Sequence, residues 1–228
     1  METYQHIVAT VALTMGVGWA SGINLYATLF VLGFMGANGY AELPPDLVIL
    51  SDPLVMGAAG FMYCVEFFAD KTPGVDTGWD AIHTFIRIPA GAILAAGAVG
   101  DVAPAAEVAA AIVGASLAAG AHMTKAGGRL LINASPEPFS NWIASLGEDA
   151  LVIVGVWGAL RHPFLFLVGL LIIITATVWA LPRLWRGVRA LWNRLLHLFR
   201  RPEAAEVEPK RLQRPTEPHT RPPDAPPL

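Results

Sequence analysis

Residues 16–24 read Gly-Val-Gly-Trp-Ala-Ser-Gly-Ile-Asn and interrupt an apolar stretch that runs from Ile7 to Gly36. A second apolar stretch, Pro104–Ile132, contains the interruption Thr124-Lys-Ala-Gly-Gly-Arg129. As helices these stretches would be about 45 Å long, which exceeds the ~30 Å hydrocarbon core of a bilayer. We therefore expect each to be kinked, broken or re-entrant. Paired glycine-interrupted segments in the two halves of a chain are typical of transporter binding sites near the bilayer midplane.

The composition predicts a multi-pass membrane protein. Apolar residues make up 54% of the chain and charged residues 14%, and the mean hydropathy is +0.51. A soluble domain carries about 25% charged residues. With the two interrupted stretches counted as one span each, we expect an all-α polytopic membrane bundle of about six spans. The further apolar segments are Pro53–Asp70, Ile82–Gly100, Phe139–Leu160 and Pro163–Leu181, and the second interrupted stretch is most apolar over Pro104–Met123.

The distribution of charge predicts the orientation. Residues 1–182 hold five Lys/Arg and 13 Asp/Glu, whereas residues 183–228 hold ten and five. Because cytoplasmic loops are rich in Lys and Arg, we assign Arg183, Arg186 and Arg189 to the cytoplasm. Six spans then place four of the five cations of residues 1–182 inside and only Arg161 outside. This predicts an inner (plasma) membrane protein with both termini in the cytoplasm.

Three spans in each half would give the halves opposite orientations, so we expect a 3+3 inverted repeat of residues 5–100 and 104–182 within a transmembrane domain of residues 1–182.

Residues 183–201 are expected to form a juxtamembrane amphipathic basic helix on anionic headgroups, separated from the last span by a bend at Pro182. A continuous extension of the last span is the alternative. Residues 202–228 are rich in proline and are expected to be a disordered cytoplasmic tail.

The strongest candidates for function are Glu148 and Asp149, which lie near the middle of an apolar segment. Ionisable residues inside a span are costly and usually face the bundle interior. Adjacent positions diverge by about 100° around a helix, so the two carboxylates should have different partners. Lys125 and Arg129 share one helix face, and Asn24 is the counterpart of Arg129 in the first half. The alternatives are a structural buried ion pair and ordinary anchoring of the cations at the inner surface.

A second polar group lies around residues 66–87. Glu66 and Asp70 are four residues apart and share a helix face. Asp76, Asp80, His83 and Arg87 recur at spacings of four, three and four, with Lys71 between the two sets. Loop capping and surface ion pairing are alternatives for Asp76 and Asp80, and Asp80 is a candidate helix N-cap. The chain has no Walker, G-x-S-x-G, C-x-x-C or H-E-x-x-H motif, so we expect no catalytic residue, metal or cofactor.

Three strings together resemble a known family. They are Gly18-Trp-Ala-Ser-Gly-Ile-Asn-Leu-Tyr-Ala27, Val65-Glu-Phe-Phe-Ala-Asp-Lys-Thr-Pro-Gly-Val-Asp76 and Thr124-Lys-Ala-Gly-Gly-Arg129. The chain resembles, over about residues 5–182, the bacterial membrane proteins of domain-of-unknown-function family 4126. This resemblance implies a small multi-pass helical architecture and no particular substrate. Asn24 stands where G-L-R-type members have Arg.

We therefore expect a small secondary transporter or permease, coupled to protons or cations, with its pathway lined by Asn24, Glu66, Asp70, Lys125, Arg129, Glu148 and Asp149. One alternative is a membrane enzyme or lipid-handling protein that acts at the cytoplasmic headgroup level through Asp70, Asp76, Asp80, His83 and Arg87. Another is a non-catalytic assembly or scaffold protein. The expected partners are the lipid bilayer, with anionic headgroups at Arg183–Arg201, and further copies of the chain in a homo-oligomer, but no nucleic acid.

Overall fold

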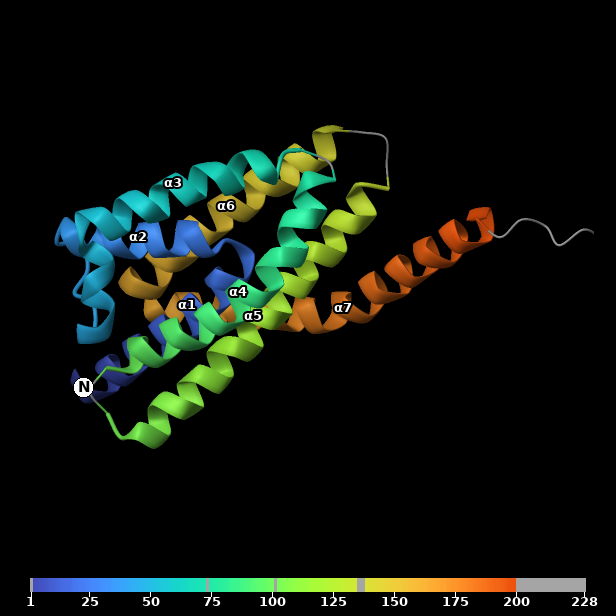
Figure 1. Cartoon of the computed structure of the whole chain (residues 1–228). Helices are drawn as coiled ribbons and strands as arrows, with labels where there is room; N and C mark the ends of the chain where they lie inside the picture. The colour runs from blue at the N-terminus through green and yellow to red at the C-terminus, as the bar shows by residue number, and fades with distance from the viewer. Residues whose placement is uncertain (1, 73, 101, 135–137, 200–228) are drawn as a thin grey trace, which may run out of the picture. The chain divides into compact units, whose positions relative to one another are not determined.

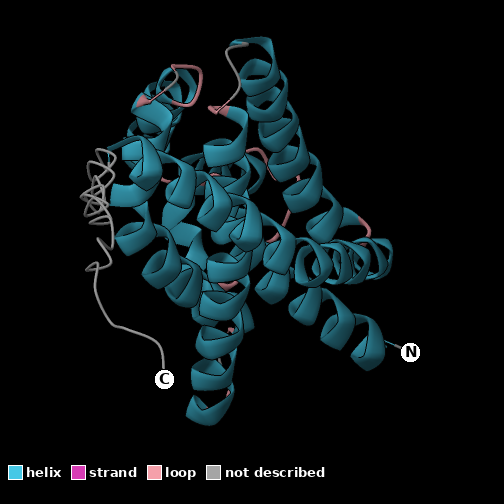
Figure 2. Ribbon diagram, turned by 90° about the vertical axis from the view of Figure 1, so that its right-hand side faces the viewer, coloured by secondary structure: helices cyan, strands magenta, loops and turns pink. Residues whose placement is uncertain are grey.

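The computed structural model describes residues 2–72, 74–100, 102–134 and 138–199, and these residues form helices joined by loops (Figure 1, Figure 2). The predicted all-α class is confirmed. Among the described residues, five helices are long and apolar enough to cross a membrane, or six if η1 and α3, which meet at a bend of 70°, count as one span. The elements are α1 (Glu2–Ile23), α2 (Leu25–Ala37), η1 (Pro45–Ser51), α3 (Pro53–Ala69), α4 (Val75–Val99), α5 (Pro104–Ile132), α6 (Pro138–Arg161) and α7 (Pro163–Phe199).

The first apolar stretch is broken at Asn24, not at its glycines. Asn24 has extended backbone angles, and its side-chain oxygen accepts a hydrogen bond from the Ala27 amide at 2.9 Å. Asparagine is a strong N-cap because it satisfies one of the free amides in the first helical turn. This cap starts α2 in a new direction, while Gly16, Gly18 and Gly22 remain inside α1.

The chain turns back at Asn24, so α1 and α2 form a helical hairpin. His6, before the tip, and Tyr40, after it, line the same cavity as Arg161, and Val31 and Met35 of α2 line a cavity with residues of α6. Helix α1 runs opposite to α6, since Gly16 approaches Ala159 and Trp19 approaches Gly155. The segment 7–36 therefore enters the bundle and returns to the end at which it began.

This hairpin fixes the end of the bundle at which the N-terminus lies. His6 shares a cavity with Glu42, Gly100 and Arg161, and we call this end of the bundle the Arg161 end. The opposite end, the Asn133 end, holds the close of α5, where Gly187 of α7 meets Leu131. The N-terminus and residues 183–189 of α7 thus lie at opposite ends of the bundle (Figure 1). The prediction of two cytoplasmic termini counted the hairpin as one crossing, and the side of the membrane that each terminus faces stays a matter for the proposed function.

The second apolar stretch has no break. α5 runs without interruption from Pro104 to Ile132, through Gly127 and Gly128. This corrects the expectation of two interrupted helices, since no cap like that of Asn24 starts a new helix within α5. The inverted repeat stays a prediction, and α5 contains no counterpart of the hairpin.

The glycines of α1 allow close helix packing. An added Cβ on Gly18 would lie 2.7 Å from the Cα of Gly114, and one on Gly22 would lie 2.8 Å from the Cα of Ala118. Small residues let membrane helices approach closely. The same surface of α5 receives Gly91 of α4, so α1, α4 and α5 pack along one line of small residues.

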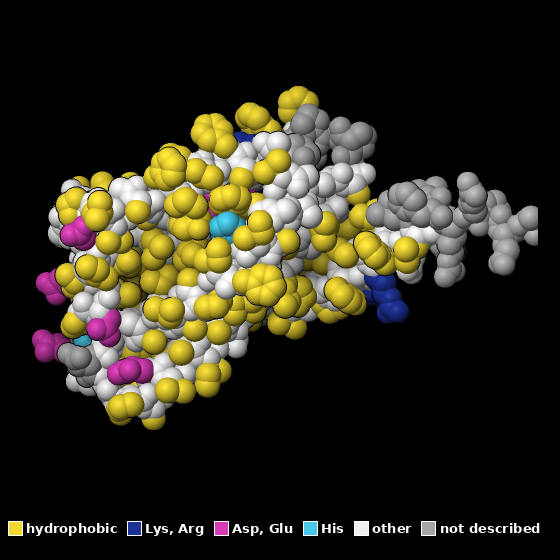
Figure 3. Space-filling view, in the orientation of Figure 1, with side chains coloured by type: hydrophobic (Ala, Val, Ile, Leu, Met, Phe, Trp, Pro, Cys, Tyr) yellow, Lys and Arg dark blue, Asp and Glu magenta, His cyan; other side chains and the backbone are white. Residues whose placement is uncertain are grey.

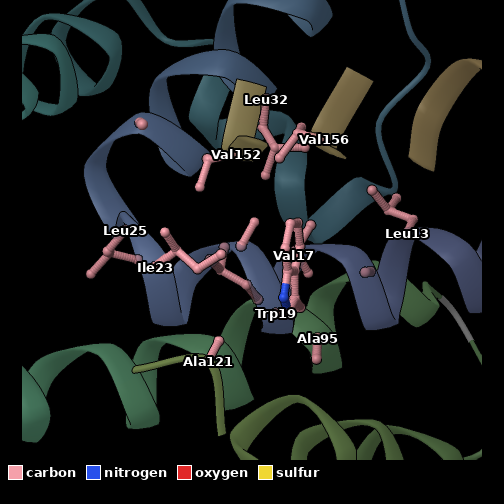
Figure 4. Packing of buried hydrophobic residues seen from close by; sticks show 14 of the residues in the cluster. Leu13, Val17, Trp19, Ile23, Leu25, Leu32, Ala95, Ala121, Val152 and Val156 are labelled. Carbon is pink, nitrogen blue, oxygen red and sulfur yellow. The ribbon is translucent and has the colours of Figure 1, made fainter. Parts of the chain in front are cut away.

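The apolar core lies between the Arg161 end and the tip of the hairpin. Leu13, Val17, Leu32, Val152 and Val156 pack there from α1, α2 and α6 (Figure 4). Hydrophobic side chains also cover much of the outer surface of the helices, as expected for contact with lipid (Figure 3). Acidic side chains gather at the end where the N-terminus lies, and among those exposed there are Glu42, Asp46, Asp52 and Glu107.

α7 continues as a helix through Pro182 to Phe199. The basic segment is therefore a continuation of the last span in secondary structure, which is the alternative to a helix separated by a bend. Arg183, Arg186 and Arg189 are exposed on it. Arg200, Arg201 and the predicted tail of residues 202–228 lie outside the described residues.

Candidate functional site

Most of the charged residues singled out in the sequence meet at the tip of the hairpin, toward the Asn133 end. We call this group the charge cluster. It joins the end of α3, the first half of α4, the last third of α5 and the middle of α6. Its members are Glu66, Asp70, Asp76, Asp80, Arg87, Lys125, Arg129 and Glu148.

Arg87 connects α3 to α4 at the most deeply buried point of the cluster. Its guanidinium donates to Glu66 at 2.6 Å and to Asp80 at 3.1 Å. The three side chains are 0%, 0% and 3% exposed. Asp80 is therefore neither a surface ion pair nor the N-cap of α4, because α4 begins at Val75 and its cap is Gly74.

Lys125 lies at the centre of the cluster and contacts carboxylates from three helices or their ends. Its Nζ is 2.7 Å from Asp70 and 3.6 Å from Glu66 at the end of α3, 3.9 Å from Asp80 of α4 and 3.6 Å from Glu148 of α6. It also donates to the backbone carbonyl of Ile23 at 3.1 Å. That carbonyl belongs to the last turn of α1, so Lys125 satisfies a free group at the tip of the hairpin.

Arg129 connects α5 to the end of α3 and to α6. Its Nη2 lies 2.5 Å from Glu148 Oε2, and its Nε lies 3.4 Å from Glu148 Oε1. Nη1 donates to the backbone carbonyl of Asp70 at 2.6 Å and to the side chain of Asn141 at 2.9 Å. Planar guanidinium groups suit such two-point contacts with carboxylates.

Asp76 anchors the loop between α3 and α4. Its carboxylate accepts hydrogen bonds from the amides of Gly74 and Thr77 at 2.9 and 2.6 Å. The side-chain nitrogen of Asn133, at the end of α5, donates to the same carboxylate at 2.7 Å. Asp76 thus caps a loop, as the sequence alternative held, but it does so while fully buried.

Glu148 and Asp149 point to different partners, as adjacent helix positions require. Glu148 meets Arg129 and Lys125, whereas Asp149 accepts a hydrogen bond from the side chain of Asn24 at 3.0 Å. Asn24 therefore caps α2 with its oxygen and holds α6 with its nitrogen. This single residue ties the tip of the hairpin to the site.

Lys71 lies beside the cluster in the loop after α3. Its Nζ donates to Ser145 at 3.1 Å and stands 3.0 Å from the centre of the Phe67 ring. Burial lowers the pKa of Lys71, since its charged form loses water. His83 stacks on Trp79 and hydrogen-bonds Tyr26 at 3.2 Å, so it joins α4 to the hairpin and not to the ion pairs.

Several neutral partners were missed in the sequence. Asn141 and Ser145 of α6 and Asn133 of α5 hold Arg129, Lys71 and Asp76. His122 of α5 lies at hydrogen-bond distance from Arg87, with 3.1 Å between its Nδ1 and the Nη1 of Arg87. Asn141, Ser145 and Asp149 recur every four residues in an apolar helix, and this polar stripe is the signal that would have found them.

Carboxylates outnumber cations at the site. The cluster together with Asp149 and Lys71 contains six carboxylates and four cations. Buried oxygens of Glu66, Asp70, Asp80 and Asp149 have no hydrogen-bond partner. Each of these four carboxylates is ion-paired or hydrogen-bonded through its other oxygen. Within the described ranges, no group of three or more His, Cys, Asp or Glu side chains could hold a metal ion.

A cavity of about 210 Å³ reaches the cluster between α1, α5, α6 and α7. Its ionisable lining is Lys125, Arg129 and Glu148, and its apolar lining includes Trp19 and Ile173. The Glu148 side chain is 20% exposed, whereas the other ion-paired side chains of the cluster are at most 3% exposed.

A second cavity, of about 780 Å³, lies at the Arg161 end and is lined in part by His6, Glu42 and Leu13. The apolar core separates it from the cluster, because the α1 residues between Leu13 and Ile23 include the buried Val17 and Trp19 (Figure 4). The site is therefore closed toward the Arg161 end by packed apolar side chains.

The family model described as a domain of unknown function (DUF4126) matches residues 11–183. The chain therefore belongs to this family, and the resemblance seen in the sequence is confirmed. No curated protein and no solved structure matches the chain.

Proposed function

We propose that this member of the DUF4126 family is a small secondary transporter, coupled to protons or cations, of the inner (plasma) membrane. The observation that carries the proposal is the contact between a cavity and an otherwise buried charge cluster at Glu148. A purely structural ion pair gains nothing from a cavity beside it. A cluster with carboxylate oxygens that lack a hydrogen-bond partner, and with one carboxylate that borders a cavity, has what a proton-coupled pathway requires.

The closed apolar core supports the same proposal. A carrier must keep its site from being open to both sides of the membrane at once, and the cluster has a cavity beside it and packed apolar side chains toward the Arg161 end. By the distribution of Lys and Arg, the Asn133 end with Arg183 faces the cytoplasm under this proposal. The N-terminus then faces the other side.

The headgroup-level enzyme has less support. Asp76, Asp80, His83 and Arg87 are 0–3% exposed and are held by one another or by neighbouring side chains. They present no reactive surface to a lipid headgroup. The assembly alternative depends on the tail of residues 202–228, which lies outside the described residues.

Reconstitution tests the proposal. The full chain would be placed in liposomes that contain a pH-sensitive dye, and gradients of sodium, potassium, phosphate and lactate would be imposed one at a time. We expect at least one gradient to drive protein-dependent proton movement, and Glu148→Gln to abolish it. Glu107→Gln, at an exposed position near the Arg161 end, is the matched control and should leave the flux unchanged. If no gradient moves protons with the wild-type chain, the proposal fails.

A further inference from the structure

We propose that the cavity beside Glu148 binds a small oxyanion, of the carboxylate or phosphate class, which replaces the Glu148 carboxylate on Arg129 and Lys125 while Glu148 takes up a proton. This assignment rests on the proposed function for its role in transport, but the binding itself is independent of flux. It names both the class of substrate and the group that couples it to protons.

The charges on the cavity wall favour an anion. The ionisable residues that line it are two cations, Lys125 and Arg129, and one carboxylate, Glu148. The other carboxylates that contact these cations are sealed behind them, with Asp70 2% and Glu66 0% exposed. Among the described residues of the cavity wall, Glu148 is thus the only carboxylate that a ligand can reach and displace.

The geometry of Arg129 fits a two-oxygen ligand. The guanidinium contacts both oxygens of Glu148, at 2.5 and 3.4 Å, and Lys125 lies 3.6 Å from one of them. A carboxylate or phosphate presents two oxygens at a similar spacing and can make the same paired contacts. The Glu148 carboxylate already makes these contacts with Arg129 and Lys125, so it shows how the carboxylate or phosphate of a ligand would bind there.

Charge balance links the anion to a proton. An anion that entered while Glu148 was ionised would meet a like charge in a poorly solvated site. When a proton adds to a Glu148 oxygen, the ion pair with Arg129 is lost and the anion forms a new one. One positive and one negative charge enter together, so the net charge of the cluster does not change.

Glu148 is the carboxylate that faces this cavity, and each neighbouring element presents its own groups to it. α5 presents Lys125 and Arg129 to it, and the end of α3 presents Asp70 and Lys71. Asp149, on α6 itself, is turned toward Asn24. From α1 and α7 the cavity is lined by Trp19, Ile23, Ile173 and Thr177, which do not titrate near neutral pH. Asp70, 3.4 Å from Arg129, keeps the guanidinium in place after Glu148 releases it.

The size of the cavity limits the ligand. A volume of about 210 Å³ corresponds to roughly seven water molecules at their share of liquid volume. The apolar wall formed by Trp19, Leu151 and Ile173 suits a short apolar group. A small monocarboxylate, a phosphate ion or the phosphate of a lipid headgroup all fit this description.

Calorimetric titration of the full chain in detergent tests the inference. The probes are inorganic phosphate, lactate and dihexanoyl phosphatidate, each titrated in two buffers that differ in ionisation enthalpy. We expect uptake of about one proton per bound anion, and an affinity that falls up to tenfold per pH unit once Glu148 is ionised in the free protein. Glu148→Gln, which mimics the protonated side chain, should bind the anion without proton uptake and lose this pH dependence.

Two further variants complete the experiment. Arg129→Lys keeps the charge but removes the paired contact, so we expect its affinity to fall at least tenfold, and Glu107→Gln should behave like the wild type. Binding of phosphate or lactate identifies a free solute as the ligand, and binding of phosphatidate alone identifies a lipid headgroup. Either result supports the oxyanion site if a proton is taken up.

The inference is overturned if none of the three probes binds to the wild type or to Glu148→Gln, or if binding involves no proton. Its failure differs from failure of the proposed function. Proton flux driven by a cation gradient, without anion binding, would keep the transporter and remove the oxyanion. Proton-linked anion binding without flux would keep the oxyanion site and remove the transporter.

Discussion

The side-chain nitrogen of Asn24 donates a hydrogen bond to Asp149 at 3.0 Å, across 125 positions of the chain. The oxygen of the same amide caps α2 through the amide of Ala27. One residue thus both turns the chain back at the tip of the hairpin and fixes that tip against α6 beside the charge cluster.

We expect Asn24→Ala to destabilise the protein by about 2–4 kcal/mol, from a lost N-cap worth about 1 kcal/mol and an unpartnered buried carboxylate that costs about 1–3 kcal/mol. Unfolding in detergent, followed by circular dichroism, measures the change. Asn38→Ala is the control, because Asn38 is exposed and bonds only within the end of α2. Equal effects of the two variants would contradict this role of Asn24.

Gly18→Ala should be strongly destabilising because the new Cβ would lie 2.7 Å from the backbone of Gly114. Overpacking of this kind typically costs about 1–3 kcal/mol. Gly120→Ala, on α5, adds a Cβ with no atom within 4 Å and should be neutral or slightly stabilising, since alanine is the better helix former. The midpoint of thermal unfolding compares the two, and a neutral Gly18→Ala would show that α1 and α5 do not pack so closely.

Removal of one partner of the Arg87–Glu66 pair should cost about 3–5 kcal/mol, because the remaining charge would be buried and unpaired. We expect Arg87→Met and Glu66→Met each to lower stability by this order, and the double variant to recover part of the loss. A double-mutant cycle of unfolding free energies measures the coupling. Additive losses would mean that the two side chains do not act as a pair.

The two termini of the membrane domain should be on opposite sides of the membrane. A reporter that is active only in the cytoplasm, fused after the last residue, should be active, and the same reporter before Met1 should not. Protease access to short epitope tags in intact cells and in inverted vesicles provides a second measurement. Detection of both tags on one side would contradict a hairpin at Asn24 that enters and leaves the bundle at the same end.

Helical spacing predicted which charged residues of the site share a helix face. It did not predict which of these faces contact one another. The spacing of four puts Glu66 with Asp70 and Lys125 with Arg129 on common helix faces, and this holds in the structure. Which faces meet depends on how the helices pack, so the contact of Arg87 with Glu66 was not predictable. The neutral partners Asn133 and Ser145 were missed because their roles exist only once a charge from another helix lies beside them.

The sequence by itself determined that the chain is a multi-pass helical membrane protein, since composition and span length are additive properties of the residues, and three of its strings pointed to the DUF4126 family. It also identified most of the charged residues of the site. Only the tertiary structure decided that the first stretch breaks at Asn24 while the second stays whole. Glycine permits either a break or a close approach, and its neighbours in space select between them: Gly18 and Gly22 meet α5 and remain helical. Asn24 caps α2 with its side-chain oxygen, and Asp149 of α6 holds its side-chain nitrogen in that position.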